Sequence, residues 1–354
     1  FNIIVEVINP TKQQDAVSAN NSPFVNYYSS APTLQDALRN VVIDSPRQLY
    51  AAQLELIILS EEAATNHMPE ILEYFSREPE SRTEVKFVIA RGDDSTKAVT
   101  IQTLLTNFSS SNIKQSLELQ QKVLGLTPVY TLNELLNMYL DPTLEISLPS
   151  IIVYGNAEEG DKKENITTST PKALTKIGTT AIFKGKDFLG YLTEEESKVH
   201  SIITGSTKES IINLDYKDNY SVFELYKIES DISPDIKDNK ITLNISGKAR
   251  IKEFHSNTNI TKAKETDRQN KELNKHIEDI IKKNFNSMRE KYNTDIFSFR
   301  QSFYRENPKY YNTHYKDTWY ESIFPNLTLE VKSNIKLYEK GNTLGGIEYE
   351  NKNN

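Results

Sequence analysis

The stretch 302-SFYRENPKYYNTHYKDTWYESIFP-325 holds the chain's only tryptophan and places seven aromatic residues within positions 303–320. Base stacking, a ligand pocket or a buried packing element would each explain this density. The basic residues of positions 303–321 are matched by acidic ones, so the aromatics lie on a near-neutral background. Because single-strand stacking platforms need a positive groove as well as aromatic side chains, this background argues against base stacking.

The aromatic residues of this stretch fall at helical offsets. Tyr311, Tyr315 and Trp319 follow one another at steps of four, and Asn307-Pro308 separates them from Phe303. The spacing predicts two short helices that meet at Asn307-Pro308, with an aromatic stripe packed on the last sheet. A surface docking patch is the alternative interpretation.

Working outward, the region 196–354 shows the clearest periodicities of the chain. Apolar residues spaced by three and four predict a long helix that ends near Asn293. Alternating residues predict strands at 219–232, 240–254 and 327–338. Thr193 is expected to cap a helix that precedes these strands. The apolar positions of the long helix are Leu273, Ile277, Ile280, Ile281, Met288 and Tyr292.

The region 1–94 alternates between strand and helix patterns, which suggests an α/β sheet. Strands are predicted at 1–8, 24–29, 54–59 and 84–90, with one helix after Thr33 and another starting at Pro69. In the region 95–195, helices are predicted at 113–124 and 131–139, strands within 145–155, and a hairpin at 179–192 that turns at 184–186. The polar segment 156–172 is interpreted as an exposed, mobile and protease-sensitive loop.

These patterns predict an α+β protein of three domains, each a mixed or antiparallel β-sheet with flanking helices. A chain of 354 residues exceeds the length at which single cores usually split, about 250 residues. The expected domains are an N-terminal α/β domain at 1–94, a middle domain with helices and a hairpin at 95–195, and a C-terminal antiparallel sheet with a long helix at 196–354.

Composition excludes several functional classes. The chain has no cysteine, which removes disulfides, thiolate nucleophiles and cysteine-ligated zinc or iron–sulfur sites. Its formal charge of −7 has the wrong sign for general nucleic-acid binding. The sequence has no run of about 18 apolar residues that would cross a membrane.

The sequence predicts no catalytic, cofactor-binding or metal-binding residue. The five histidines are scattered, and the pair His276 and Asp279 lacks a third ligand. The RGDD sequence at 91–94 is better interpreted as a turn after a strand. No nucleophile elbow or phosphate-binding loop is present, and paired acids such as Glu61-Glu62 suit helix starts.

On these residues, the chain resembles the Ger(x)C family, the C subunits of spore germinant receptors. The most specific likeness is the C-terminal order of a long helix followed by KYNTDIFSFRQSFYRENPKYY and DTWYESIFPNLTLEVKSNIKL. A likeness to the family's N-terminal segment is seen in APTLQDALRNV, in QLELIILSEEAA and in the charged run at 77–82. The hairpin sequence AIFKGKDFLGYLTEEES is similar to the family's central segment. The family-like positions of the C-terminal match are Asp295, Phe299, Pro308, Tyr311, Trp319 and Phe324.

The resemblance implies a non-enzymatic lipoprotein that works beside polytopic A and B subunits in nutrient-triggered germination. It implies a location at the outer face of the spore inner membrane, no cofactor and no nucleic-acid partner. We expect a signal peptide and an acylated (palmitate-bearing) lipobox cysteine upstream of Phe1, so the lipid anchor would be absent from this chain. The alternative is an extracytoplasmic lipoprotein that binds or hydrolyses a spore-envelope ligand.

Overall fold

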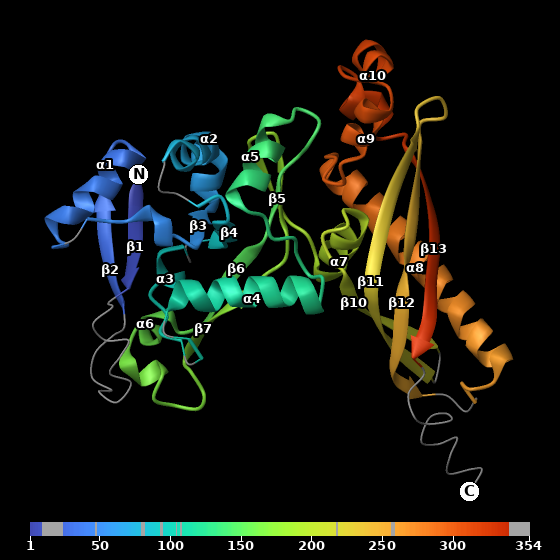
Figure 1. The fold of residues 1–354 in the computed structure, drawn as a ribbon, viewed down its shortest axis with the longest axis horizontal. Helices are drawn as coiled ribbons and strands as arrows, with labels where there is room; N and C mark the ends of the chain where they lie inside the picture. Colours follow the sequence, from blue (N-terminus) through green and yellow to red (C-terminus); the bar gives the residue numbers. More distant parts are fainter. Residues whose placement is uncertain are drawn as a thin grey trace, which may run out of the picture. The chain divides into compact units, whose positions relative to one another are not determined.

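The structure is a computed structural model that describes residues 1–8, 24–46, 48–78, 82–92, 95–103, 105–106, 108–216, 219–255 and 259–339. The chain contains both helices and strands in mixed or antiparallel sheets, and the predicted α+β class is confirmed (Figure 1). The chain separates into two compact units, each described by itself below. Unit 1 comprises Phe1–Glu118, Val129–Leu140 and Ile146–Gly190, and unit 2 comprises Leu119–Pro128, Asp141–Glu145 and Tyr191–Asn354.

The main sheet of unit 1 is mixed. Its strand order is β3-β4-β6-β7, in which β3, β4 and β6 run parallel and β7 runs antiparallel to β6. This sheet joins strands from both sides of residue 94, and the division into three domains stays a prediction. The strands are β3 (Leu56–Ser60), β4 (Lys86–Ala90), β6 (Ser150–Gly155) and β7 (Ala173–Ile177).

Two smaller sheets complete unit 1. The strands β1 and β2 pair antiparallel, and the predicted hairpin at 179–192 is confirmed as β8 and β9, beside the short strand β5. Their bounds are β1 (Asn2–Ile8), β2 (Phe24–Ser30), β5 (Ser147–Leu148), β8 (Ala181–Lys184) and β9 (Asp187–Tyr191).

The first helix of unit 1 begins at a local capping signal. Thr33 accepts the N–H of Asp36, as predicted, and starts α1. The helix α4 begins in unit 1 and its last turn is assigned to unit 2. The helices are α1 (Leu34–Asn40), α2 (Glu61–Arg77), α3 (Ser95–Ala98), α4 (Ser109–Val123), α5 (Leu132–Leu140) and α6 (Ala157–Gly160).

The predicted start of a helix at Pro69 is wrong, because α2 begins at Glu61 and continues through the proline. Ser60 caps the helix by accepting the N–H of Ala63 at 3.0 Å. The buried residues on either side of Pro69 form one face, so packing outweighs the hydrogen bond that proline cannot make. That face consists of Ala64, Met68, Ile71, Leu72 and Phe75.

The exposed-loop interpretation of 156–172 is also wrong in part. The segment contains α6 and a 3-10 turn, and its Asn165 is fully buried. The Asn165 side chain donates to the carbonyls of Gln102 and Ala173 and accepts the N–H of Ala173. These contacts fix the segment against unit 1, whereas its protease sensitivity stays a prediction.

Unit 2 is built on a four-stranded sheet of order β10-β11-β12-β13. The first three strands are antiparallel, as predicted, but the antiparallel prediction is wrong for β13, which runs parallel to β12 at the edge. The three strands predicted from alternation are confirmed, but β10 was not predicted. The strands are β10 (Glu209–Tyr216), β11 (Asn219–Asp235), β12 (Lys240–His255) and β13 (Thr328–Glu339).

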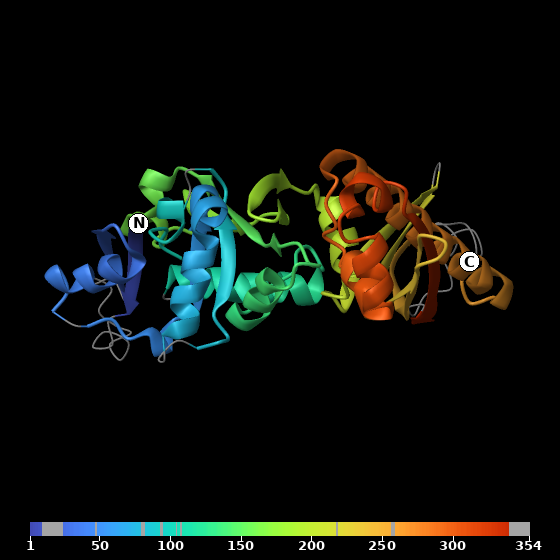
Figure 2. The ribbon, with the colours of Figure 1, turned by 90° about the horizontal axis from the view of Figure 1, so that it is seen from above.

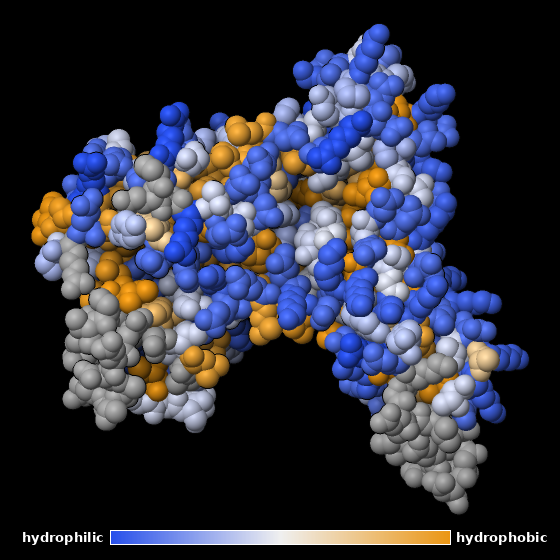
Figure 3. Space-filling model, viewed as in Figure 1, coloured by the Kyte–Doolittle hydropathy of each residue, from blue (hydrophilic) through white to orange (hydrophobic). Residues whose placement is uncertain are grey.

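One face of this sheet carries the core. Ile241, Leu243 and Ile245 of β12 are buried, while the intervening side chains are polar. The helix α8 lies beside β13 and contributes the buried Leu273 and Ile277 (Figure 1, Figure 2). The surface over β11, β12 and β13 in the view of Figure 3 is mostly hydrophilic. The helices of unit 2 include α7 (Glu194–Ile203), α8 (Ala263–Tyr292), α9 (Phe299–Glu306) and α10 (Pro308–His314).

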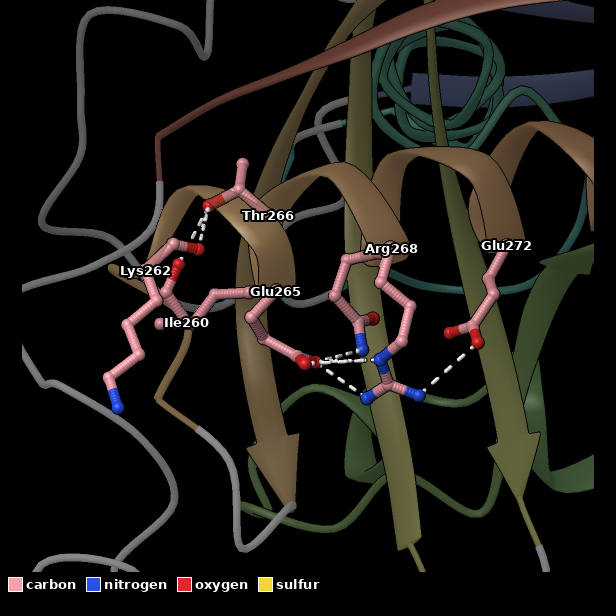
Figure 4. A network of polar contacts seen from close by, with 7 residues as sticks. Ile260, Lys262, Glu265, Thr266, Arg268 and Glu272 are labelled. Atoms are coloured by element: carbon pink, nitrogen blue, oxygen red, sulfur yellow. Dashed lines mark hydrogen bonds and ion pairs between the residues drawn. The ribbon is translucent and has the colours of Figure 1, made fainter.

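The helix α8 is longer at its N-terminus than the apolar pattern shows. The Thr266 hydroxyl donates to the carbonyls of Ile260 and Lys262 in its first turn. Arg268 bridges Glu265 and Glu272 on the solvent side, at 2.6 and 3.2 Å (Figure 4). The predicted end near Asn293 is confirmed.

Candidate functional site

The aromatic stretch forms the two predicted helices. α9 ends at Glu306 and α10 starts at Pro308, because the Asn307 side chain accepts the N–H of Tyr310 at 3.0 Å and proline suits the first helical position. A π-helical turn, Trp319–Ile323, then leads toward β13.

The rings of this stretch face inward. Trp319 is 1% exposed, and its ring centroid lies 5.5 Å from Phe303 and 6.2 Å from Phe324. Phe303 and Phe324 are fully buried, whereas Tyr304 is 38% exposed. The core interpretation is confirmed, and the docking-patch interpretation is wrong for Trp319.

A second aromatic group adjoins the first. Phe285 of α8 lies 5.4 Å from Phe297 and 5.7 Å from Phe299, measured between ring centroids. Phe285 also meets Phe324 edge to face at 6.2 Å, which joins the two groups into one aromatic core.

The loop between α8 and α9 buries a carboxyl group, that of Asp295. Its oxygens accept the backbone N–H groups of Phe297, Phe299 and Arg300, so it caps the start of α9. Asn293 and Ser298 both take positive φ angles, of 43° and 65°, which turns the loop around this carboxyl. Burial raises the pKa of Asp295 to about 7, although the three N–H bonds favour its ionised form.

A tyrosine joins this loop to a second acid. The Tyr320 hydroxyl donates to Glu145 Oε1 at 2.6 Å and accepts the N–H of Asp295 at 3.4 Å. Burial and the neighbouring carboxylates Glu145 and Asp295 raise the pKa of Tyr320, so the phenol stays protonated. Arg300 donates from Nε to the Tyr311 hydroxyl, which ties α9 to α10.

The buried His200 of α7 completes this polar cluster. Its Nε2 lies 2.9 Å from the carbonyl oxygen of Ile296, one residue after Asp295. Burial lowers the pKa of His200 to about 4, so the ring is neutral and Nε2 donates. We call Glu145, His200, Asp295, Arg300 and Tyr320 the Asp295 cluster.

The edge of the sheet is also closed by side chains. Asn274 of α8 accepts the N–H of Ile335 at 2.7 Å and donates to its carbonyl at 2.8 Å. Asn270 accepts the N–H of Leu337 and Glu278 accepts that of Ser333. Three residues spaced by four on α8 therefore satisfy three N–H groups of the edge strand β13, which would otherwise be open to pairing.

The other residues weighed from sequence lie apart from this cluster. Asp279 is exposed and His276 is half-buried on α8, and the described residues contain no group of three histidine, aspartate or glutamate side chains placed to hold a metal. Gly92 has a φ of +57°, as the turn interpretation of 91–94 predicts, while Asp93 and Asp94 lie outside the described residues. Within the described part of the chain, no helix has the length and apolarity to cross a bilayer.

The Asp295 cluster was missed from sequence as a unit, although Asp295 itself was among the family-like positions. Its members come from four segments far apart in the chain, and only the KYNTDIF sequence marked one of them. Its hydrogen bonds join groups of the protein itself, and they connect the loop before α9 to Glu145 and to α7.

Comparison with known proteins covers almost the whole chain. Residues 1–153 match the family described as "Spore germination protein N-terminal domain", and residues 178–341 match "Spore germination B3/ GerAC like, C-terminal". Spore germination protein KC of Bacillus subtilis (strain 168) is 23% identical, over 95% of this chain and 85% of that protein. Spore germination protein B3 of the same organism is 22% identical, over 93% of this chain and 84% of that protein.

A solved structure supports the same assignment at the level of fold. The structure titled "Crystal Structure of the GerBC protein" aligns with a TM-score of 0.55 and 18% identity, covering 88% of this chain and 85% of that one. The two matching family models together with this fold show that the chain belongs to the Ger(x)C family, the spore germination proteins that include the C subunits of germinant receptors.

Proposed function

We propose that the chain is the non-enzymatic C subunit of a nutrient germinant receptor, which acts beside polytopic A and B subunits at the outer face of the spore inner membrane. Its role is to hold or relay contacts within that complex. A lipid anchor, added to a cysteine upstream of Phe1 in the precursor, attaches it to the membrane; two acyl chains suit a stable anchor, because one chain binds only marginally.

The observation that carries this proposal is that the titratable side chains of unit 2 with the largest pKa shifts are buried in the protein. Asp295, His200 and Tyr320 are the most strongly perturbed titratable groups of the described residues, and each bonds to the protein itself. Perturbed groups at a catalytic site instead face a cleft where a substrate can reach them. The arrangement supports a scaffold whose function resides in its surfaces.

The partner claim is tested in spores. The full-length protein, tagged at its C-terminus and expressed from its own locus, is purified from detergent-solubilised inner membrane. We expect multi-spanning receptor subunits to co-purify, and labelling with a palmitate analogue to mark the tagged protein. Recovery from the soluble fraction without label or membrane partners would contradict both the anchor and the complex.

The claim that the nutrient is sensed elsewhere is tested by calorimetry of the chain against common nutrient germinants. We expect no saturable heat with neutral sugars or zwitterionic amino acids. A dissociation constant in the micromolar range for any of them would move the sensing site into this subunit.

A further inference from the structure

A groove of ≈ 360 Å³ lies within unit 2, where the last turns of α8 pass the start of β13. Two cations, two carboxamides and one hydroxyl line it beside apolar side chains, and no carboxylate is among the described residues that line it. The lining residues are Lys282, Phe285, Asn286 and Arg289 of α8 and residues 325–329.

Arg289 is half-buried at this groove without a carboxylate partner. Its guanidinium donates to the carbonyl of Leu327 at 2.6 Å and to Asn286 Oδ1 at 2.8 Å, both of which are neutral. A guanidinium has five N–H donors, so three remain after these two bonds. Burial lowers the pKa of Arg289, and the exposed Glu290 only partly offsets this.

Lys282 lies two turns before Arg289 on the same side of the helix. Within the part of the chain that the structure describes, neither cation takes part in an ion pair, and the Thr328 hydroxyl at the rim bonds to no protein group. The groove therefore presents positive charge and donors that no carboxylate of the described residues compensates, although the Arg289 guanidinium also lies 4.9 Å from the centroid of the Phe285 ring.

Two other cations of α8 have carboxylate partners. Arg268 is held between Glu265 and Glu272 (Figure 4), and Lys283, next to Lys282 in sequence, pairs with Glu195 at 3.2 Å. Carboxylates thus neutralise these two cations, whereas no ion pair within the described residues joins Lys282 or Arg289.

We infer that this groove binds an oxyanion group, a phosphate or a carboxylate, on a small ligand that carries more than one negative charge. The free N–H groups of Arg289 meet one oxyanion, since a guanidinium matches the geometry of carboxylate and phosphate. Lys282, about 10 Å away along the helix axis, meets the second charge. Zwitterionic amino acids do not suit the groove, because their ammonium group would be repelled by both cations.

The test is calorimetry of the whole chain with inorganic phosphate, pyrophosphate and succinate at constant ionic strength. We expect saturable one-to-one binding of at least one anion. Lys282→Gln should weaken it about tenfold or more, as expected for loss of one charge-assisted contact. The matched control Lys283→Gln, one residue away and outside the groove, should leave it unchanged.

A second variant, Arg289→Lys, keeps the charge but loses the planar fork, and should weaken phosphate binding while circular dichroism shows an intact fold. Vesicles containing phosphatidylglycerol, compared with phosphatidylcholine alone, distinguish a lipid headgroup from a free anion as the source. The inference is overturned if neither the anions nor the anionic vesicles bind saturably. It is equally overturned if Lys282→Gln and Lys283→Gln reduce binding to the same extent, since that would indicate diffuse attraction.

Discussion

One buried cluster in each unit differs from the other in its side chains. Around β4 and β6 of unit 1 the buried cluster is aliphatic, whereas the core of unit 2 beyond α8 is aromatic and encloses the Asp295 cluster. Aliphatic cores tolerate volume-conserving exchange, while a buried polar group needs every one of its partners. We therefore expect unit 2 to be the less tolerant of substitution. The aliphatic cluster comprises Leu56, Val88, Ala90, Ala98, Ile113, Leu117, Val129 and Ile151.

The largest effect is expected at the centre of the aromatic core. Trp319→Ala should lower the free energy of unfolding by about 3–5 kcal/mol, because it leaves a large cavity among Phe303, Tyr311 and Phe324. Urea denaturation measures it. The control is Tyr304→Ala, in the same stretch but at 38% exposure, which should lower the free energy of unfolding much less. Equal losses in the two variants would contradict the distinction between core and surface aromatics.

The next effect concerns the cap of α9. Asp295→Ala should cost about 3 kcal/mol or more, because three buried N–H groups lose their acceptor and each costs about 1 kcal/mol or more. Denaturation of this variant beside the exposed Asp279→Ala gives the comparison. A cost near zero would mean that the Asp295 carboxyl does not cap α9.

The Asp295 cluster also predicts that the free energy of unfolding depends on pH, with opposing contributions from Asp295 and His200. The folded pKa of Asp295, about 7, lies above its ordinary value of 3.8, so its contribution to stability is present below pH 3.8 and is lost as pH rises to 7. The folded pKa of His200, about 4, lies below 6.5, so its contribution is present above pH 6.5 and is lost as pH falls to 4.

Single substitutions should separate the contributions of Asp295 and His200 to this pH dependence. Relative to the unaltered protein, Asp295→Asn should become more stable with rising pH between 4 and 7, because the opposing Asp295 slope is gone. His200→Gln, which keeps a donor for the Ile296 carbonyl, should become less stable relative to the unaltered protein as pH rises from 4 to 6.5. Unfolding at four pH values across this window is the measurement, and parallel curves for all three proteins would contradict the assignment.

A smaller effect is expected at the sheet edge. Asn274→Ala should cost about 2 kcal/mol, because it removes two hydrogen bonds to the backbone of Ile335. Lys275→Ala, on the exposed side of the same helix turn, should be nearly neutral. Hydrogen exchange at the Ile335 amide should speed up in the first variant only, and no change there would show that the edge is closed by something else.

The smallest effect is expected in unit 1. Ile151→Val, within the aliphatic cluster, should cost about 1 kcal/mol, because it removes a single methylene and leaves every polar contact in place. A cost as large as that of Trp319→Ala would abolish the contrast between the units.

Much of the fold could be predicted because local rules decide it. The break at Asn307-Pro308, the four-residue aromatic spacing and the Thr193 cap each depend on a few adjacent residues, and all three match the structure. The long helix α8 was predicted from its apolar face alone, but its polar first turns, where Arg268 bridges two acids, carry no apolar signal.

The features that could not be predicted depend on contacts between residues that are distant in sequence. Asn165 is buried because it meets Gln102, and Pro69 is tolerated because the α2 face packs on both sides of it. The Asp295 cluster needs Glu145 and His200 from other segments, and the Lys282–Arg289 groove needs the loop at 325–329. No local sequence pattern shows which distant residues come into contact. Single residues of the candidate site could therefore be recognised from sequence, but the site as a whole could not.

The central claim is that the aromatic stretch is buried scaffold, which leaves the surfaces of the protein for function. The most direct test uses the intrinsic fluorescence of Trp319, the only tryptophan, in the unmodified chain. At 1% exposure, we predict blue-shifted emission and strong protection from acrylamide quenching, both lost on unfolding in urea. Emission and quenching in buffer equal to those of the urea-unfolded chain would place Trp319 in solvent and contradict the account.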